Sequence, residues 1–107
     1  MLEGRVVRVW KGEGTRDGVA RYCAEHFPHH VLPQLRGVDG FLEARVLVRT
    51  TDTGSELVVM TTWASLEAVK AFAGEDFGRA VVEPAVAELL EHVDEDVTHY
   101  AIAHDVV

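Results

Sequence analysis

Several features that large protein classes require are scarce or missing in this chain. Its single cysteine, Cys23, excludes an internal disulfide and the ligand cluster of a structural zinc site. No apolar run approaches the ~20 residues that cross a bilayer, and the N-terminus lacks the basic start and apolar stretch of a signal peptide. We therefore expect a soluble cytoplasmic chain without a membrane partner.

Positive charge is also in short supply. The chain has 10 Lys and Arg residues against 18 Asp and Glu residues, a formal net charge of −8. Because phosphate binding depends on clustered cations, we expect no nucleic-acid partner. The 107 residues, 48% of them hydrophobic, contain no linker, internal repeat or low-complexity tract. We therefore expect a single domain over residues 1–107.

Helix and strand patterns alternate along the chain in a simple order. β-Branched and alternating apolar residues mark strands, and apolar residues three and four apart mark helices. The expected strands are 6–10, 41–50, 56–63 and 97–104, and the expected helices are 17–27, 29–35, 66–73 and 84–93. This β-α-β-β-α-β order, with an extra helical segment before the last strand, predicts a ferredoxin-like α+β fold: a four-stranded antiparallel sheet with helices on one face.

Turn and cap residues set the expected boundaries of these elements. The first strand stops at Gly12-Glu13-Gly14, after which Thr15 caps the first helix. Pro28 kinks or segments that helix. A loop of several residues around 52–55 joins the second and third strands into a hairpin. Ser65 caps the helix that follows the third strand.

Both faces of the predicted sheet carry apolar side chains. In the third strand Leu57 and Val59 point to one side, while Val58 and Met60 point to the other. The second strand divides in the same way, with Leu42, Ala44, Val46 and Val48 on one side and Phe41, Glu43, Arg45, Leu47 and Arg49 on the other. Two helices cover only one face, and a second copy of the chain is the commonest cover for the other. We therefore predict a homodimer.

Four segments, 6–10, 30–41, 58–68 and 99–100, resemble the antibiotic biosynthesis monooxygenase-like family of dimeric α+β barrel proteins. The similarity spans nearly the whole chain. Its most recognisable part is a strand that ends in Trp63, followed by Ser65-x-Glu67 and a short amphipathic helix. The resemblance implies that two sheets pack face to face in a dimer. It also implies a cleft between each protomer's sheet and its helices, where relatives bind ligands.

The resemblance implies an activity as well, with an alternative beside it. Cofactor-free oxygenases of this family oxidise electron-rich polycyclic phenols, while the protein binds, orients and assists proton movement. Our leading hypothesis is a cofactor-independent monooxygenase-like protein acting on a small aromatic or polyketide-like compound. The alternative is a non-catalytic small-ligand-binding or stress-related dimer. It is favoured by the complete lack of asparagine, which characterised relatives use as a partner in the site. A structural association module is a third interpretation.

Two residues are candidates for the site through this resemblance. Trp63 matches a tryptophan that lies beside the ligand in relatives, but a large core residue at a strand–helix junction is an equally open interpretation. His30 lies in a family-like His-x-Leu-Pro-x-Leu stretch at the expected cleft mouth. Imidazole titrates near neutrality, so His30 is the candidate proton acceptor, with a surface or capping histidine as the other interpretation.

Two further candidates follow from their positions in the predicted elements. Tyr22 lies on the inward stripe of the first helix and either offers its hydroxyl to a ligand or is a core residue. Arg8 shares one side of the first strand with Trp10. It pairs either with an anionic ligand or, in a cross-strand or dimer salt bridge, with Glu43 or Glu56. His99 and Tyr100 face opposite sides of the last strand, so only one of them looks into a given cleft.

Neither a metal nor an organic cofactor is expected. His26 and His30 would share one face of an unbroken helix, which suits a metal, but Pro28 intervenes and no third ligand is evident. Haem-degrading relatives carry a haem-ligating histidine after the matching tryptophan, whereas residues 66–82 contain none. Gly12-Glu13-Gly14 lacks the spacing of a dinucleotide loop. We therefore expect no metal, haem or flavin to copurify.

Overall fold

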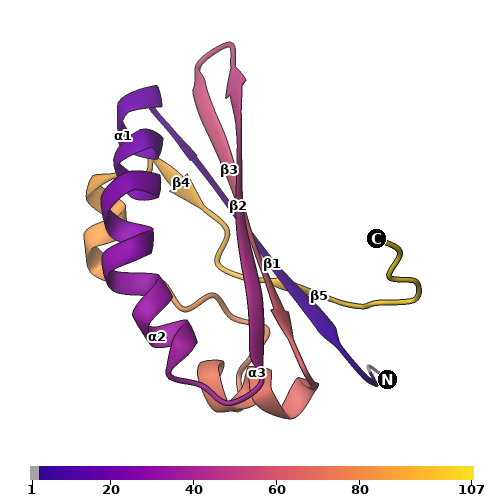
Figure 1. Cartoon of the computed structure of the whole chain (residues 1–107). Helices are drawn as coiled ribbons and strands as arrows, with labels where there is room; N and C mark the ends of the chain where they lie inside the picture. Colours follow the sequence, from indigo (N-terminus) through magenta and orange to yellow (C-terminus); the bar gives the residue numbers. More distant parts are fainter. Residues whose placement is uncertain (1–2) are drawn as a thin grey trace.

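A twisted antiparallel sheet carries its helices on one side (Figure 1). The computed structural model describes residues 3–107. The strands are β1 (Val6–Gly14), β2 (Phe41–Thr51), β3 (Gly54–Trp63), β4 (His92–Val93) and β5 (Thr98–Ala101). The helical segments are α1 (Arg16–Arg21), η1 (Tyr22–Val31), α2 (Leu32–Arg36), α3 (Leu66–Ala73) and η2 (Pro84–Glu88). Among these described residues, no helix is long and apolar enough to cross a membrane.

The strand order confirms the ferredoxin-like prediction. The sheet runs β2-β3-β1-β4, with β5 also paired to β1, and all these pairings are antiparallel. The predicted last strand, 97–104, is wrong in its bounds because the chain leaves β1 between β4 and β5. There residues 95–97 bond to the segment after α3, through Ala80 N–H to the Glu95 carbonyl and Val97 N–H to the Gly78 carbonyl. The predicted 84–93 helix is correspondingly short, and Val93 lies in β4.

The first strand does not stop at its glycines. Gly12 and Gly14 remain in β1, paired with Leu57 and Ser55 of β3. Their role is to let another segment lie close to the strand. A Cβ on Gly12 would be 3.0 Å from Leu90 Cδ1, and one on Gly14 would be 3.2 Å from the Leu90 Cα. Sequence reasoning read these glycines as a turn, whereas they permit a close approach of backbones.

The first helical region is continuous from Arg16 to Arg36, so the expected break at Pro28 does not occur. The chain instead widens into the π-helical segment η1, where the Leu32 N–H donates to the Phe27 carbonyl five residues back. A wider turn moves the carbonyl that a proline ring would otherwise strike. The expected caps are confirmed: the Thr15 hydroxyl accepts from the Gly18 N–H at 3.0 Å, and the Ser65 hydroxyl accepts from the Ala68 N–H at 3.2 Å.

A β-bulge changes the expected side-chain alternation in β2. The register shifts between Phe41 and Glu43, so Leu42 is the extra residue and is half exposed. Phe41 therefore joins Ala44 on the helix-facing side, where both pack on the core. The hairpin loop is also shorter than expected, because Thr51 pairs directly with Gly54.

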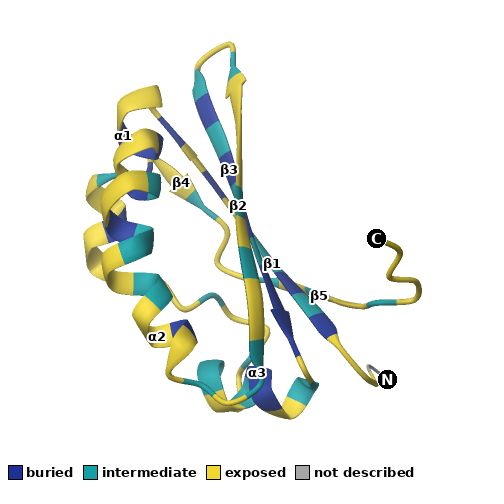
Figure 2. Ribbon diagram, viewed as in Figure 1, coloured by how far each residue is buried: buried dark blue, intermediate teal, exposed yellow. Residues whose placement is uncertain are grey.

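The core lies between the helices and the sheet, in two clusters. Figure 2 shows the helices exposed outward and buried toward the sheet. One cluster is Val19, Tyr22, Leu57, Val59, Val86 and Leu90, and the other is Val6, Leu35, Trp63, Ala68 and Val69. Tyr22 of the first cluster and Leu35 of the second also line a cavity in this layer.

Candidate functional site

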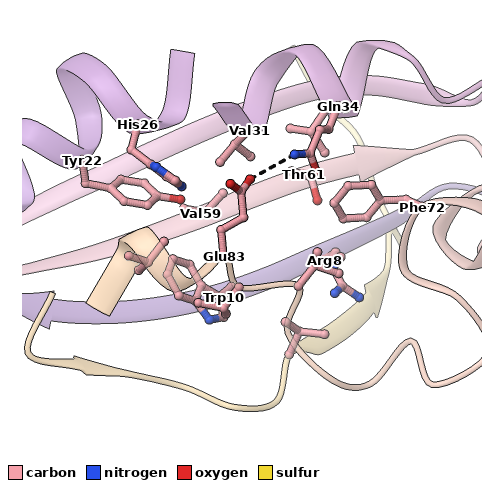
Figure 3. A pocket seen from close by; sticks show the side chains of 15 residues that line it. Arg8, Trp10, Tyr22, His26, Val31, Gln34, Val59, Thr61, Phe72 and Glu83 are labelled. Atoms are coloured by element: carbon pink, nitrogen blue, oxygen red, sulfur yellow. Dashed lines mark hydrogen bonds between the residues drawn. The ribbon is translucent and has the colours of Figure 1, made fainter. Parts of the chain in front are cut away.

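A cavity of about 70 Å³ lies between the first helical region and the sheet, partly open to solvent. We call it the inner cavity. Its wall is mostly apolar, with a few polar side chains (Figure 3). The lining residues are Arg8, Trp10, Tyr22, His26, Val31, Gln34, Leu35, Val59, Thr61, Phe72, Val81, Val82, Glu83, Val86 and Val97. In its lining, with apolar walls and few convergent polar groups, the cavity resembles a small-molecule site, although its volume is smaller than the roughly 300 Å³ at which such sites begin.

One wall is formed by Val81, Val82 and Glu83, at the end of an irregular segment, residues 77–83. Arg8 holds this segment by donating to the Phe77 carbonyl at 2.6 Å and to the Arg79 carbonyl at 3.0 Å. At its other end, the Glu83 carboxylate accepts a hydrogen bond from Gln34 Nε2 at 3.0 Å (Figure 3). This wall of the cavity is therefore held by polar contacts between segments that are far apart in the sequence.

Arg8 is a buried cation without a carboxylate partner in residues 3–107. Its residue is 5% exposed, and burial lowers the pKa of its guanidinium to about 10. The predicted cross-strand pairing with Glu43 or Glu56 is wrong, because within the chain those side chains lie on the opposite face and pair with Arg45 and Arg49. His99 Nε2 lies 3.1 Å from Arg8 Nη1, and burial followed by the Arg8 charge lowers the pKa of His99. His99 is therefore the hydrogen-bond acceptor in this contact.

Tyr22 and His26 lie at the end of the inner cavity away from Arg8, and the Glu83 carboxylate lies between them and Gln34 (Figure 3). Burial raises the pKa of Tyr22, with smaller contributions from Cys23 and Glu83. Burial lowers the pKa of His26, the Glu83 carboxylate partly offsets this, and His30 lowers it further. Near neutrality this end therefore presents a protonated phenol and a neutral imidazole beside a carboxylate.

Trp63 is buried behind the cavity wall, in contrast to the expectation that it lines the cleft. It has no exposed surface, and its indole N–H donates to the Thr61 hydroxyl at 2.8 Å. Its ring packs against Phe41 and Phe72 at centroid distances of 5.5 and 5.3 Å. Because Thr61 and Phe72 both line the inner cavity, Trp63 supports that wall from behind. The bulge that turns Phe41 inward helps to enclose it.

His30 is exposed and lies outside the inner cavity, in a shallow groove of about 220 Å³. We call this the outer groove. It is lined by Arg21, Glu25, His26, His29, His30, Ala85, Glu88 and Leu89. The rings of His26 and His30 are 5.3 Å apart, so these two histidines do share a helix face. No group of three or more His, Cys, Asp or Glu residues within 3–107 is arranged to hold a metal ion.

Tyr22 and Arg8, two of the predicted ligand-binding residues, line the cavity, but sequence reasoning did not identify its other polar groups. His26 was considered only as half of a metal pair, although its four-residue spacing from Tyr22 predicts a shared face. Glu83 and Gln34 had no local signal, because their meeting depends on the path of an irregular segment. The structure thus brings together Arg8 and Tyr22, and it separates them from His30 and Trp63.

Comparisons with known proteins agree with this fold. A putative antibiotic biosynthesis monooxygenase from Bacillus cereus is 21% identical, with a TM-score of 0.63 over 96% of this chain and 95% of that one. A monooxygenase from the gene ActVA-Orf6 of Streptomyces coelicolor, solved with the ligand nanaomycin D, is 20% identical, with a TM-score of 0.67 over 98% and 92%. An MhuD mutant with two manganese protoporphyrin IX per active site is 20% identical, with a TM-score of 0.61 over 95% and 98%.

The family assignment rests on a sequence match. No curated protein matches this chain significantly in sequence. The family model described as antibiotic biosynthesis monooxygenase matches residues 15–84, which include the first helical region, β2, β3 and α3. This span is well over half of the chain and holds most of the residues that line the inner cavity. The chain belongs to the antibiotic biosynthesis monooxygenase family.

Proposed function

We propose that this protein is a cofactor-independent monooxygenase that binds a small electron-rich phenol or polyketide-like compound in the inner cavity. The observation that carries the proposal is an apolar cavity with polar groups at its two ends. Tyr22 and His26 lie at one end with the Glu83 carboxylate beside them, and the buried Arg8 lies at the other end. The family supports a monooxygenase-like activity, and organic ligands bound to two proteins of the same fold support a small-molecule site.

The proposed reaction needs no external electron donor, because the substrate supplies all the electrons. A phenol and O₂ give a quinone and water: the ring gains one oxygen atom and loses two hydrogens as it is oxidised by four electrons. One atom of O₂ enters the ring and the other leaves as water. The phenolate is the form that passes an electron to oxygen, so the protein must orient the ring and accept its proton.

Each polar group has a role that fits its surroundings. The Tyr22 hydroxyl stays protonated and donates a hydrogen bond to the substrate oxygen. Arg8 supplies an unpaired positive charge that favours an anionic ring or oxygen species in the cavity. Trp63 keeps Thr61 and Phe72 in place and acts on ligand binding through them. His30 accepts protons at the solvent side of the helix rather than from the substrate directly.

Oxidation of 1-naphthol tests the proposal. The purified protein is incubated with 1-naphthol under ¹⁸O₂, with a chelator present and no flavin, nicotinamide or haem added. We expect naphthoquinone carrying one ¹⁸O atom, with the second ¹⁸O in water. Tyr22→Phe should weaken naphthol binding by about fivefold, because it removes one hydrogen bond of about 1 kcal/mol. Turnover that requires added flavin, or quinone without ¹⁸O, contradicts the proposal.

A non-catalytic ligand-binding protein is the second candidate function. It is favoured by the placement of Trp63 behind the wall and by the complete lack of asparagine. Such a protein would retain Tyr22 and Arg8 as ligand contacts and use them for binding alone. Tight 1-naphthol binding without any quinone over many hours would support this function and refute the oxygenase.

The proposed working unit is a cytoplasmic homodimer. The open sheet face, on the side without helices, carries the apolar side chains of Val7, Val9, Leu47, Val58, Met60 and Tyr100. Leu47 and Tyr100 are 47% and 55% exposed, which is unusual for side chains of that size clustered on one face. A two-fold axis would place the same face of a second chain against this one and bury these side chains.

A further inference from the structure

We propose that His26 is the proton acceptor of the inner cavity and that the protons leave through it into the outer groove, where His30 is the next acceptor. This inference rests on the proposed function, because it requires a phenol bound in the cavity. It assigns the acid–base step to His26, and it makes His30 the proton acceptor in the outer groove.

The position of His26 carries the inference. It is the one described residue that lines both the inner cavity and the outer groove. The residue is only 4% exposed, so its ring fills the wall between the two spaces. Its ring nitrogens have no hydrogen bond to another group within 3–107, yet neither is a sealed buried atom. They are therefore open to the cavity or the groove and free to take part in proton transfer.

A row of aromatic rings continues on both sides of His26. The Tyr22 ring lies on the cavity side and the His30 ring on the groove side, each with its centroid 5.3 Å from the His26 centroid. Trp10 extends the row inward, 6.1 Å from Tyr22. A phenol stacked along Trp10 and Tyr22 would bring its hydroxyl toward His26 and Glu83 (Figure 3).

Charged and titratable groups face His26 from its own helix and from residues 83–88. Glu83 faces it from the segment before η2, and its carboxylate favours the protonated ring. His30 disfavours the protonated ring when it is itself charged. The remaining charged and titratable neighbours line the groove or the same helix face, namely Arg21, Tyr22, Cys23, Glu25, His29 and Glu88. Glu83, the carboxylate whose charge acts to raise the His26 pKa, is thus placed to stabilise an imidazolium at His26.

The protonation states select His26 among the three groups at this end. Burial keeps the Tyr22 pKa high, so its hydroxyl is a donor and does not take up a proton. Burial keeps the His26 pKa low, so its imidazole is neutral and able to accept one. Carboxylates such as Glu83 are ordinarily weaker bases than imidazole. Glu83 also already accepts a hydrogen bond from Gln34.

The step itself is a simple proton transfer. The phenol O–H bond breaks, the proton passes to a ring nitrogen of His26, and the products are a phenolate and an imidazolium beside Glu83. The imidazolium then releases the proton on its groove side, to His30 or to solvent, and returns to the neutral form. No electron moves in this step, so it is separable from the later reaction with O₂.

The test uses 4-nitrophenol, because its phenolate absorbs visible light and its neutral form does not. We expect wild-type protein to bind the probe and raise its phenolate fraction at a pH below the probe's own pKa. His26→Gln should keep the affinity within about threefold and lower the bound phenolate-to-phenol ratio at least fivefold. His30→Gln should change that ratio less than twofold. The matched control His104→Gln, an exposed histidine outside both spaces, should leave it unchanged.

The results distinguish a failure of the His26 inference from a failure of the proposed function. An equal phenolate fraction in wild type and His26→Gln overturns the inference and leaves the proposed function standing. Failure of 4-nitrophenol to bind wild-type protein at millimolar concentration refutes the proposed function, and the inference with it. If His26→Gln does not fold, histidine ¹⁵N spectra of the unaltered protein decide. Probe binding should convert His26 to the imidazolium, and a ring that stays neutral refutes the transfer.

Discussion

Replacing Trp63 with phenylalanine should lower the stability of the protein and leave its ligand affinity almost unchanged. The indole has no exposed surface, it packs between Phe41 and Phe72, and it is separated from the inner cavity by Thr61 and Phe72. A ligand in the cavity therefore does not touch it. This expectation reverses the one that family resemblance alone supports, in which the tryptophan stacks on the ligand.

The size of the effect follows from two losses. A buried phenylalanine leaves a void of roughly 40 Å³, which costs about 1 kcal/mol at ~24 cal/mol per Å³. The Thr61 hydroxyl also loses the indole N–H that donates to it at 2.8 Å, and a hydrogen bond of this kind contributes about 1 kcal/mol. The free energy of unfolding should thus fall by about 2 kcal/mol, which lowers the melting temperature by roughly 10 °C in a domain of this size.

The assay pairs thermal unfolding by circular dichroism with calorimetric titration of 1-naphthol. Trp10→Phe is the matched control, because Trp10 lines the cavity and donates its indole N–H to the exposed Asp94 carbonyl at 2.8 Å. We expect Trp10→Phe to weaken naphthol binding by about threefold to tenfold, as expected for a lost ring contact of about 1 kcal/mol, with a smaller change in melting temperature. If Trp63→Phe loses naphthol affinity at an unchanged melting temperature, Trp63 faces the ligand and our description of the wall is wrong.

Two further predictions concern association and pH. Met60→Asp should shift the mass in light scattering from twice the 11.8 kDa chain mass to one, because burial of its carboxylate in the proposed interface is costly and the cross-strand neighbour Arg45 already pairs with Glu43. Ala71→Asp, on α3, should remain dimeric, and a dimeric Met60→Asp would show that another surface associates. Burial lowers the pKa of both His26 and His99, so the unfolded chain takes up protons first as the pH falls. The free energy of unfolding should keep its highest value above pH ~6.5 and decrease below that pH. A urea midpoint as high at pH 5.5 as at pH 7.5 would contradict this.

Most of the fold could be predicted because its signals are local. Thr15 and Ser65 cap their helices as expected, and the strand patterns 41–50 and 56–63 form the expected hairpin. The errors occur where a distant segment decides the outcome. Gly12 resembles a turn residue in sequence, but it is a strand residue that makes room for Leu90. The last strand divides because residues 95–97 bond to the segment after α3, and no local pattern records that contact.

The candidate site was only partly predictable for the same reason. Tyr22 and Arg8 were identified because helix and strand periodicity alone points them toward the helix–sheet layer. Glu83 lies in an irregular segment whose path depends on the Arg8 contacts and on Gln34. The prediction that Trp63 lines the cavity is wrong because a tryptophan at the end of a strand can either face the cavity or pack behind the residues that line it. The bulge at Leu42, which turns Phe41 onto it, has no clear signature in the sequence.

Pro28 connects the local sequence to the proposed chemistry. A proline inside an α-helix strikes the carbonyl four residues earlier, and a π-helical turn relieves that contact by widening the helix. In η1 the widened path carries Tyr22, His26 and His30 at four-residue intervals, and their rings remain 5.3 Å apart in a row. The row passes from the inner cavity to the outer groove. A substitution of Pro28 that restores α-helical geometry would rotate His30 relative to His26. We therefore expect Pro28, which the sequence indicates as a break in the helix, to set the spacing of His26 and His30 on which the proposed proton release depends.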